Sequence, residues 1–246
     1  MGKIKQIAKG SNINQSLIIN KGNLTLQLDK EALFNLVKDY CSIDTAKIID
    51  LLKKEIEKIP QEFRRFPSKR IFIPLLQQLS YNLDEDYLKN IYLNLLRSSM
   101  DAEQQNKVHT SFLYIVSQLC PDEAKILKVI GEQNELVMHP IIDIDIHVEN
   151  GYISLAKNIA FQGLNECEHP ENHCVYYENL LRLNLITIPQ GERVIDKEYY
   201  KYMENHPTIM KIINNSPHSK NGKIEFKEKG FMLTKLGAEF IKICLS

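Results

Sequence analysis

The sequence is poor in glycine, lacks tryptophan and has no excess of charge of either sign. Ten glycines among 246 residues leave little material for loops that bind phosphate, and neither a P-loop nor a G-x-G-x-x-G turn occurs. The 31 basic and 31 acidic side chains cancel, so no overall field draws the protein to nucleic acid or to an anionic membrane. Binding of either kind must therefore come from a local patch.

Signals for export and for membrane insertion are also missing. The N-terminus, MGKIKQIAKGSNINQS, lacks the apolar segment of a signal peptide, and nowhere do ~18 apolar residues run together as a membrane span requires. The cysteines are odd in number and scattered, which suits reduced thiols better than a disulfide framework. They are Cys41, Cys120, Cys167, Cys174 and Cys244. We therefore expect a cytoplasmic protein that does not insert into a membrane.

Motifs for covalent catalysis do not occur. The sequence contains no G-x-S-x-G elbow and no cysteine in a caspase-like or papain-like context. We therefore predict no catalytic residues and no required cofactor, and we expect the protein to act by binding rather than as an enzyme.

Residues 10–28 alternate apolar and polar side chains around a short turn. The pattern consists of Leu17, Ile19, Leu24, Leu26 and Leu28, with Lys21-Gly22-Asn23 supplying the turn. A lone hairpin is marginal in water, so it should either dock on the body of the protein or pair with an edge of another chain. We predict an N-terminal β-hairpin appendage over residues 1–30, and both roles stay open.

Residues 31–131 show helical periodicity. Asp29 is placed to cap the first helix, and apolar residues then recur at steps of three and four in successive segments. The segment from Pro121 to Gly131 has proline in the first helical position, two acidic residues in the first turn and glycine at its end. We therefore predict a helical bundle over residues 31–131.

The pattern changes in the rest of the chain. Residues 141–149 alternate strictly between apolar and polar and lead into Asn150-Gly151, a dipeptide typical of hairpin turns. This predicts a β-hairpin. A helical piece is predicted to follow near residues 155–164.

The C-terminal part has an order of elements typical of a winged helix. Residues 174–186 have the spacing of a helix that runs into a strand, and residues 223–246 predict a two-strand ribbon followed by a helix capped by Thr234. We therefore predict a winged-helix-like domain over residues 132–246. The expected fold class is mainly α with small β elements (α+β), in which a helical bundle is followed by this winged-helix-like module.

Two groups of basic residues are candidates for binding nucleic acid. They are Arg64, Arg65, Lys69, Arg70, Lys220, Lys223, Lys227 and Lys229. Basic side chains can neutralise phosphates, although the first group can also be a solvated joint between helices. A DNA-binding regulator would need both groups on one surface. The predicted recognition helix, residues 175–182, offers Arg182 as its only positive charge, which is poor for reading bases.

One short loop has the residue types of a zinc site. Cys167, His169, His173 and Cys174 place two thiols and two imidazoles within eight residues, and zinc takes such ligands in a tetrahedral shell. Structural zinc sites usually draw two ligand pairs from separate elements, so an ordinary loop rich in histidine is the alternative.

The polar face of the strand predicted at residues 141–149 is a second candidate for binding metal. It carries Asp143, Asp145, His147 and Glu149. Neighbouring side chains on one face of a strand lie ~7 Å apart, so three could not share one ion without a bulge. The solvent face of an amphipathic strand is the plainer interpretation.

Four stretches of the sequence resemble successive blocks of one protein family. They are IPLLQQLSYNLDEDYLKNIYLNLLRSSMD, HTSFLYIVSQLCPDEAKIL, YYENLLRLNLITIP and FMLTKLGAEFIKICL, within Ile73 to Leu245. These blocks look like those of the Abi-alpha (abortive infection alpha) family of bacterial proteins. The resemblance implies a helical protein with a winged-helix-like tail, assigned to phage defence, with no established catalytic residues. The sequence departs from that pattern at residues 10–28, where the family has a longer helical lead.

These observations favour a binding protein of bacterial phage defence that acts through protein partners or self-association. A winged-helix regulator that binds DNA is the alternative. A metal-dependent hydrolase that uses the cysteine and histidine loop or the acidic strand is a second alternative. For the loop the candidate cofactor is zinc, and for the strand it is a divalent metal ion.

Overall fold

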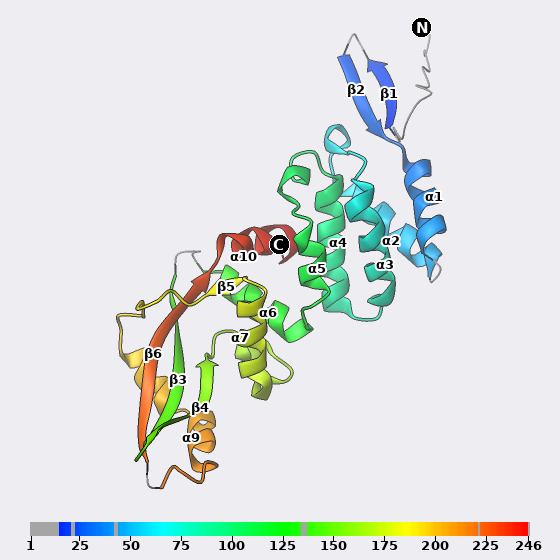
Figure 1. Cartoon of the computed structure of the whole chain (residues 1–246). Helices are drawn as coiled ribbons and strands as arrows, with labels where there is room; N and C mark the ends of the chain where they lie inside the picture. The colour runs from blue at the N-terminus through cyan, green and yellow to red at the C-terminus, as the bar shows by residue number, and fades with distance from the viewer. Residues whose placement is uncertain (1–14, 21–22, 42–43, 134–136, 221, 246) are drawn as a thin grey trace. The chain divides into compact units, whose positions relative to one another are not determined.

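The computed structural model groups the chain into two units (Figure 1). Unit 1 comprises residues 1–118 and 242–246, and unit 2 comprises residues 119–241. The structure describes residues 15–20, 23–41, 44–133, 137–220 and 222–245. Its described residues are mainly helical, with a two-stranded and a four-stranded antiparallel sheet, which confirms the predicted α+β class. Within the described ranges, no helix combines the length and the apolar character needed to cross a bilayer.

Unit 1 contains a β-hairpin formed by β1 (Gln15–Asn20) and β2 (Asn23–Leu28). The two strands are antiparallel, with Gln15 opposite Leu28 and Asn20 opposite Asn23. This pairing confirms the predicted hairpin, although Asn23, which was predicted in the turn, is the first residue of β2. The turn residues 21–22 and residues 10–14 of the predicted pattern lie outside the described residues.

Amphipathic helices form the rest of unit 1. The first, α1 (Lys30–Tyr40), begins after Asp29, whose carboxylate accepts the N–H of Ala32 at 3.1 Å, as the capping rule predicts. The others are α2 (Thr45–Glu57), η1 (Gln61–Phe63), α3 (Lys69–Tyr81), α4 (Asp86–Met100), η2 (Gln105–Lys107) and α5 (Ser111–Val116). Each long helix buries one apolar stripe, which includes Leu33, Ile48, Leu52, Phe72, Leu76, Tyr92 and Leu96.

The chain returns to unit 1 in η5 (Ile241–Leu245), a short π-helix. The side-chain amide of Asn94 on α4 donates to the carbonyl oxygen of Cys244 at 3.0 Å. Cys244 is fully buried, and burial raises the pKa of its thiol well above the ordinary value. This cysteine therefore acts as a small core residue, as free cysteines usually do.

Unit 2 is built on an antiparallel sheet in which the described strands follow the order β4-β3-β6-β5. The middle strand β3 (His139–Val148) pairs with β4 (Gly151–Ile159) on one side and with β6 (Lys223–Leu233) on the other. The short β5 (Ile186–Thr187) pairs with the end of β6. Val148 lies opposite Gly151, which confirms the hairpin predicted at Asn150-Gly151.

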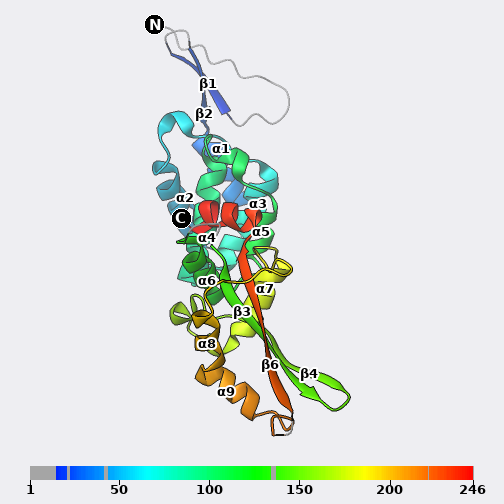
Figure 2. The same ribbon diagram turned by 90° about the vertical axis from the view of Figure 1, so that its left-hand side faces the viewer.

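Helices α8 (Glu198–Glu204) and α9 (Pro207–Asn214) follow each other along the sheet (Figure 2). They cover the apolar face of β3 and form a buried cluster of Ile142, Ile144, Ile159, Tyr200, Met203, Ile209 and Ile213. Burial of a side chain of this size stabilises the fold by roughly 1.5–3 kcal/mol. The other described helices of unit 2 are α6 (Pro121–Gly131), η3 (Leu164–Glu166), η4 (Pro170–Asn172), α7 (His173–Arg182) and α10 (Lys235–Phe240).

Helix α6 has the bounds that its end signals predict, but it packs with unit 2. Its contacts are with α7 and η3. The division between the units therefore falls at residues 118 and 119, whereas the sequence placed the end of the first helical region at residue 131.

Two predictions about β structure are wrong. The segment predicted as helical near residues 155–164 continues β4 to Ile159, and only the short η3 follows. The backbone of β3 supplies a hydrogen-bonding partner along this segment, and Ile159 is buried opposite Ile142, so tertiary pairing overrides local helix propensity. The two-strand ribbon predicted after residue 223 is a single strand, β6.

Gly230 marks a close approach inside this uninterrupted strand. It lies inside β6 opposite Pro140, and its N–H donates to the carbonyl of Glu192 at 3.0 Å. An added Cβ atom would lie 2.2 Å from the sulfur of Met138.

The cap predicted at Thr234 is confirmed, since its hydroxyl accepts the N–H of Gly237 at 2.9 Å.

Candidate functional site

A cleft with a volume of about 1250 Å³ lies in unit 2. Its walls come from the chain between β4 and α7, from the start of α7, and from α8 and α9. Aromatic and imidazole rings are prominent in these walls, namely Phe161, His173, Tyr199, Tyr202 and His206. A concave surface of rings with a few polar atoms is the usual form of a ligand site.

Four of these rings lie in contact and form what we call the ring cluster: Phe161, His173, Tyr202 and His206. The ring of His206 packs on Phe161 with centroids 4.3 Å apart, and Tyr202 lies edge-on to His206 at 5.8 Å. Phe161 also lies 5.9 Å from the ring of His173. His206 is oriented because it caps α9, where its Nδ1 accepts the N–H of Thr208 at 3.3 Å.

His173 is the buried polar member of the ring cluster. It is only 4% exposed, and burial lowers the pKa of its imidazole, with His206 adding a smaller effect in the same direction. The ring is therefore neutral at pH 7. Its Nδ1 lies 3.3 Å from the carbonyl oxygen of Pro170, whereas its buried Nε2 has no hydrogen-bond partner among the described residues.

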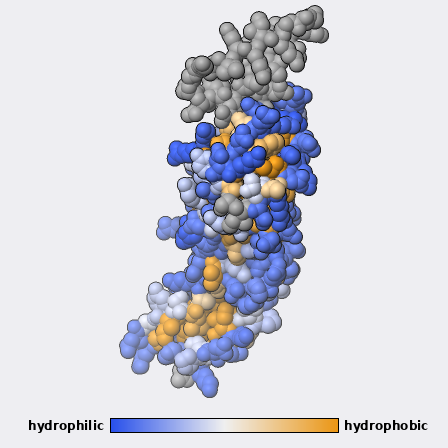
Figure 3. Space-filling view, turned by 90° about the vertical axis from the view of Figure 1, so that its right-hand side faces the viewer, coloured by the Kyte–Doolittle hydropathy of each residue, from blue (hydrophilic) through white to orange (hydrophobic). Residues whose placement is uncertain are grey.

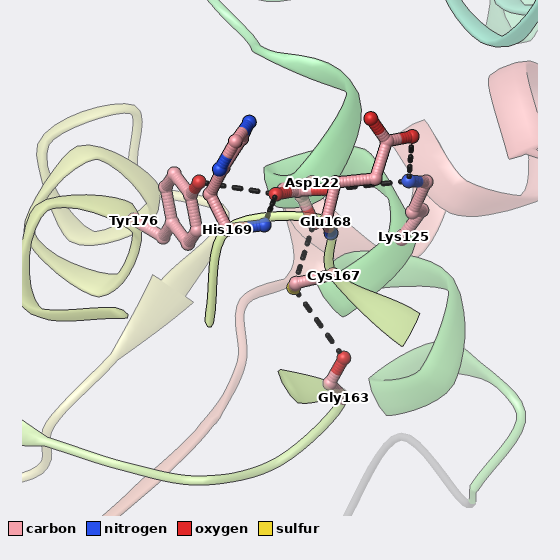
Figure 4. A network of polar contacts seen from close by, with 7 residues as sticks. All are labelled: Asp122, Lys125, Gly163, Cys167, Glu168, His169 and Tyr176. Atoms are coloured by element: carbon pink, nitrogen blue, oxygen red, sulfur yellow. Dashed lines mark hydrogen bonds and ion pairs between the residues drawn. The ribbon is translucent and has the colours of Figure 1, made fainter. Parts of the chain in front are cut away.

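A network around Asp122 fixes the loop beside the cleft (Figure 4). The buried carboxylate of Asp122 accepts the N–H groups of Glu168 at 3.0 Å and His169 at 2.9 Å, the ammonium of Lys125 at 3.1 Å and the hydroxyl of Tyr176 at 3.1 Å. Burial by itself would raise the pKa of Asp122, but these donors outweigh it and lower the pKa to about 2. The carboxylate is therefore ionised and ties the loop to the first turn of α6.

The predicted zinc ligands are not brought together. The thiol of Cys167 points to the carbonyls of Gly163 and Asp122, at 3.6 and 3.9 Å, and burial raises its pKa to about 11 (Figure 4). The side chain of His169 is exposed and lies 3.4 Å from a carboxylate oxygen of Glu171.

His173 and Cys174, by contrast, start α7 and line the cleft, and burial raises the pKa of the Cys174 thiol. Zinc binds thiolates, which this burial disfavours. Among all the described residues, no three His, Cys, Asp or Glu side chains are placed to hold a metal ion. The Asp122 network gives the physical reason, because it holds the loop of Cys167 and His169 to α6 while the other pair belongs to a helix.

The acidic residues of β3 form ion pairs with β6 and not a metal site. The carboxylate of Asp143 lies 2.6 Å from Lys229, and that of Asp145 lies 2.5 Å from Lys227. His147 lies 2.6 Å from Glu225 in the same diagonal arrangement. Asp145 is 2% exposed, so the expected solvent face of this strand is wrong at that position. We call these pairs the β3–β6 ladder.

The ladder also occupies two of the lysines predicted to bind nucleic acid, Lys227 and Lys229. Lys220 and Lys223, by contrast, are exposed. The four residues of unit 1 that were predicted to bind nucleic acid likewise divide into two that are hydrogen-bonded to the backbone and two that are exposed. Arg64 donates to the carbonyl of Ile59 and Arg65 to that of Glu62, both at 2.8 Å, while Lys69 and Arg70 are exposed at the start of α3.

The chain is an α+β protein of two units, and unit 2 contains a cleft lined with aromatic and imidazole rings. A family model described as abortive infection alpha matches residues 44–244. The chain therefore belongs to the abortive infection alpha family, as its sequence blocks predicted, and this membership indicates an abortive-infection-related role.

Two further comparisons add little. No curated protein matches the chain. A similar solved structure is that of an uncharacterized protein from the hydrocarbon-degrading marine bacterium Alcanivorax borkumensis SK2. It is 9% identical, the match covers 59% of this chain and 96% of that chain, and the TM-score is 0.34. A similarity of this size carries no argument about fold or function.

Sequence reasoning missed most of the ring cluster. It found His173 as a candidate zinc ligand but did not single out Phe161, Tyr202 or His206. One signal was present, since His206 precedes Pro207 in the way that a helix cap precedes a proline in the first turn. Tyr202 lies four residues before this cap.

Proposed function

We propose that this protein is a non-enzymatic component of bacterial phage defence, located in the cytoplasm, which acts by binding a protein partner at the cleft of unit 2. The observation that carries the proposal is the exposed aromatic rim of that cleft. Tyr199 is 54% exposed and Tyr202 is 64% exposed, although both line the cleft. Tyrosine is enriched where proteins recognise each other, because it buries a large rigid surface with little loss of side-chain entropy.

The surface of unit 2 supports the same proposal. Figure 3 shows apolar side chains gathered in the lower part of one face, at the level of β4 and α9. Hydrophobic residues that are only partly buried against the cluster under α8 and α9 include Leu155, Ala156 and Ile212. Exposed apolar patches with a polar rim commonly mark interaction sites.

The test is protection of bacteria from phage by variants of the cleft rim. Tyr202→Asp should abolish protection and also the capture of the partner that the unaltered protein retains during infection. Tyr114→Asp is the matched control, since Tyr114 is 63% exposed but belongs to α5 in unit 1. Full protection by a folded Tyr202→Asp protein would contradict the proposal.

A winged-helix regulator that binds DNA is the alternative proposal. Its support is the exposure of Lys220 and Lys223 next to β6. Because Lys227 and Lys229 are engaged in the β3–β6 ladder, the charge reversal that tests this alternative cleanly is Lys223→Glu. Duplex binding that is lost in Lys223→Glu and weakened by salt would favour the regulator over the interaction protein.

A further inference from the structure

His173, which lines the cleft, carries a buried hydrogen-bond acceptor that the described protein does not use. The carbonyl oxygen of Pro170 can only accept, so the neighbouring Nδ1 of His173 carries the proton of this neutral ring. Nε2 is then the unprotonated nitrogen, with a lone pair. It is buried and has no partner in the described part of the chain, and such an atom destabilises a fold unless a donor reaches it. His173 lines the cleft but its Nε2 is covered, so a ligand in the cleft that donates to this atom must move the surrounding side chains aside.

The other members of the ring cluster supply a surface for a flat group. Phe161 lies between the two imidazoles, and His206 and Tyr202 extend the series toward the exposed rim. Aromatic rings pack against each other through offset and edge-on contacts, so this wall favours an aromatic ligand over an aliphatic one.

The charge of the cleft selects against anions. Its described lining carries the carboxylates of Glu171, Asp196 and Glu198, against a single lysine, Lys211. A concave surface with an excess of one sign concentrates ligands of the opposite sign and repels those of its own.

We infer that the cleft binds an aromatic ring that bears an N–H or O–H donor and no negative charge, with the donor placed on Nε2 of His173. Indole is the simplest group with this chemistry. Two sources can supply it, namely a tryptophan side chain of a partner protein or a free aromatic molecule. The first source rests on the proposed function, because the tryptophan would belong to the bound partner.

The first experiment compares matched ligands by calorimetric titration of the full chain. Methylation of indole at nitrogen removes the donor and keeps the ring, so 1-methylindole should bind about tenfold more weakly than indole, the loss expected for one buried hydrogen bond. Tryptamine should also bind more tightly than indole-3-acetate, since the two differ in the sign of their charge. Equal affinities for indole and 1-methylindole, or no binding of any of the four, would overturn the inference.

Two variants of His173 test whether its Nε2 is the atom that accepts the hydrogen bond from the ligand. In His173→Asn the side-chain amide can still donate to Pro170, as Nδ1 does, but no acceptor remains at the position of Nε2. His173→Gln places an amide oxygen at that position. The preference for indole over 1-methylindole should fall to near one in His173→Asn and persist in His173→Gln. An undiminished preference in a folded His173→Asn protein would show that another atom accepts the donor.

The last experiment distinguishes a tryptophan side chain of a partner from a free aromatic molecule. It also tests the inference separately from the proposed function. A Lys-Trp-Lys peptide with blocked ends is compared with tryptamine. Tighter binding of the peptide supports a partner's tryptophan, and tighter binding of tryptamine supports a free molecule. The inference and the proposed function can fail separately, because the indole preference is measured on the purified chain without any partner, whereas phage protection is measured in infected bacteria.

Discussion

Asp122 illustrates how one buried side chain can determine the course of a loop. Its two carboxylate oxygens accept from two backbone N–H groups, one ammonium and one hydroxyl, so the charge is compensated by hydrogen bonds rather than by one counter-ion. The residues that it holds, Glu168 and His169, precede η4 and the start of α7. The position of His173 in the cleft therefore depends on a carboxylate that does not line the cleft.

Asp122→Asn should destabilise unit 2 by about 2–4 kcal/mol, because an amide cannot accept from all four donors and leaves buried groups unpaired. Urea unfolding measures the change. Glu168→Gln is the control, since the Glu168 side chain is 75% exposed and its ion pair with Lys125 is of the surface kind, worth at most about 1 kcal/mol. Similar losses in the two variants would show that the network does not hold the loop.

The same residue predicts a dependence of stability on pH. The pKa of Asp122 in the folded chain is about 2, below its ordinary 3.8, so its carboxylate stabilises the fold above about pH 4. That contribution is lost as the pH falls from about 4 toward 2, because the unfolded chain takes up the proton first. The free energy of unfolding should fall more steeply over this range in the unaltered protein than in Asp122→Asn. Parallel pH profiles would contradict the assignment.

Lys227→Met should destabilise the protein by about 2–4 kcal/mol, because it leaves the buried carboxylate of Asp145 without its cation. The pair with Lys227 is the main cause of the lowered pKa of Asp145, so the pKa should rise in the variant. Thermal unfolding and NMR titration of the carboxyl carbon measure the two effects. Lys223→Met is the control, since Lys223 is exposed at the start of the same strand. A loss of DNA binding in a Lys227 variant can therefore be attributed to a lost phosphate contact only if the sheet is shown to be intact.

At the scale of elements, the sequence predicted what local chemistry determines. The bounds of α6 follow from Pro121, the acidic first turn and Gly131, and α1 and α10 begin after the predicted caps. The extension of β4 was missed because pairing with the neighbouring β3 overrides the local helix propensity of this segment. The single strand β6 was missed because it depends on pairing with β3, which lies far away in the sequence. The cleft was missed for the same reason, since the segments that carry its rings come together only in the folded unit.

Gly237 is a place where an element depends on close packing. An added Cβ atom would lie 2.0 Å from the carbonyl oxygen of Leu185, a backbone atom that cannot move aside easily. Gly237→Ala should therefore destabilise the protein by about 1–3 kcal/mol, although alanine normally stabilises a helix relative to glycine. Lys235→Ala, at an exposed position of the same helix, should be nearly neutral. Chemical denaturation compares the two, and a stabilising Gly237→Ala would disprove the close approach.

At the scale of the whole molecule, the predicted role of the N-terminal hairpin in self-association can be tested by deletion. Among the described residues, β1 and β2 pair with each other and with no third strand, so their outer edges could pair with a strand from another chain. If the protein forms a stable oligomer through this hairpin, removal of residues 1–28 should reduce the particle to the mass of one chain in light scattering. Unchanged molar mass per particle, after allowance for the deleted residues, would exclude the hairpin as the contact.

The late position of β6 and η5 in the sequence has a consequence for synthesis on the ribosome. Unit 2 needs β6, residues 223–233, to complete its sheet, and unit 1 receives residues 242–245 as part of its packing. While residues 119–222 emerge, β3 has its β4 partner but an unpaired edge on the other side, and a nascent chain in this state is open to mispairing. Neither unit can therefore finish folding co-translationally until the segment from residue 223 to residue 245 has left the exit tunnel, so a chain interrupted before this segment would yield neither unit in complete form.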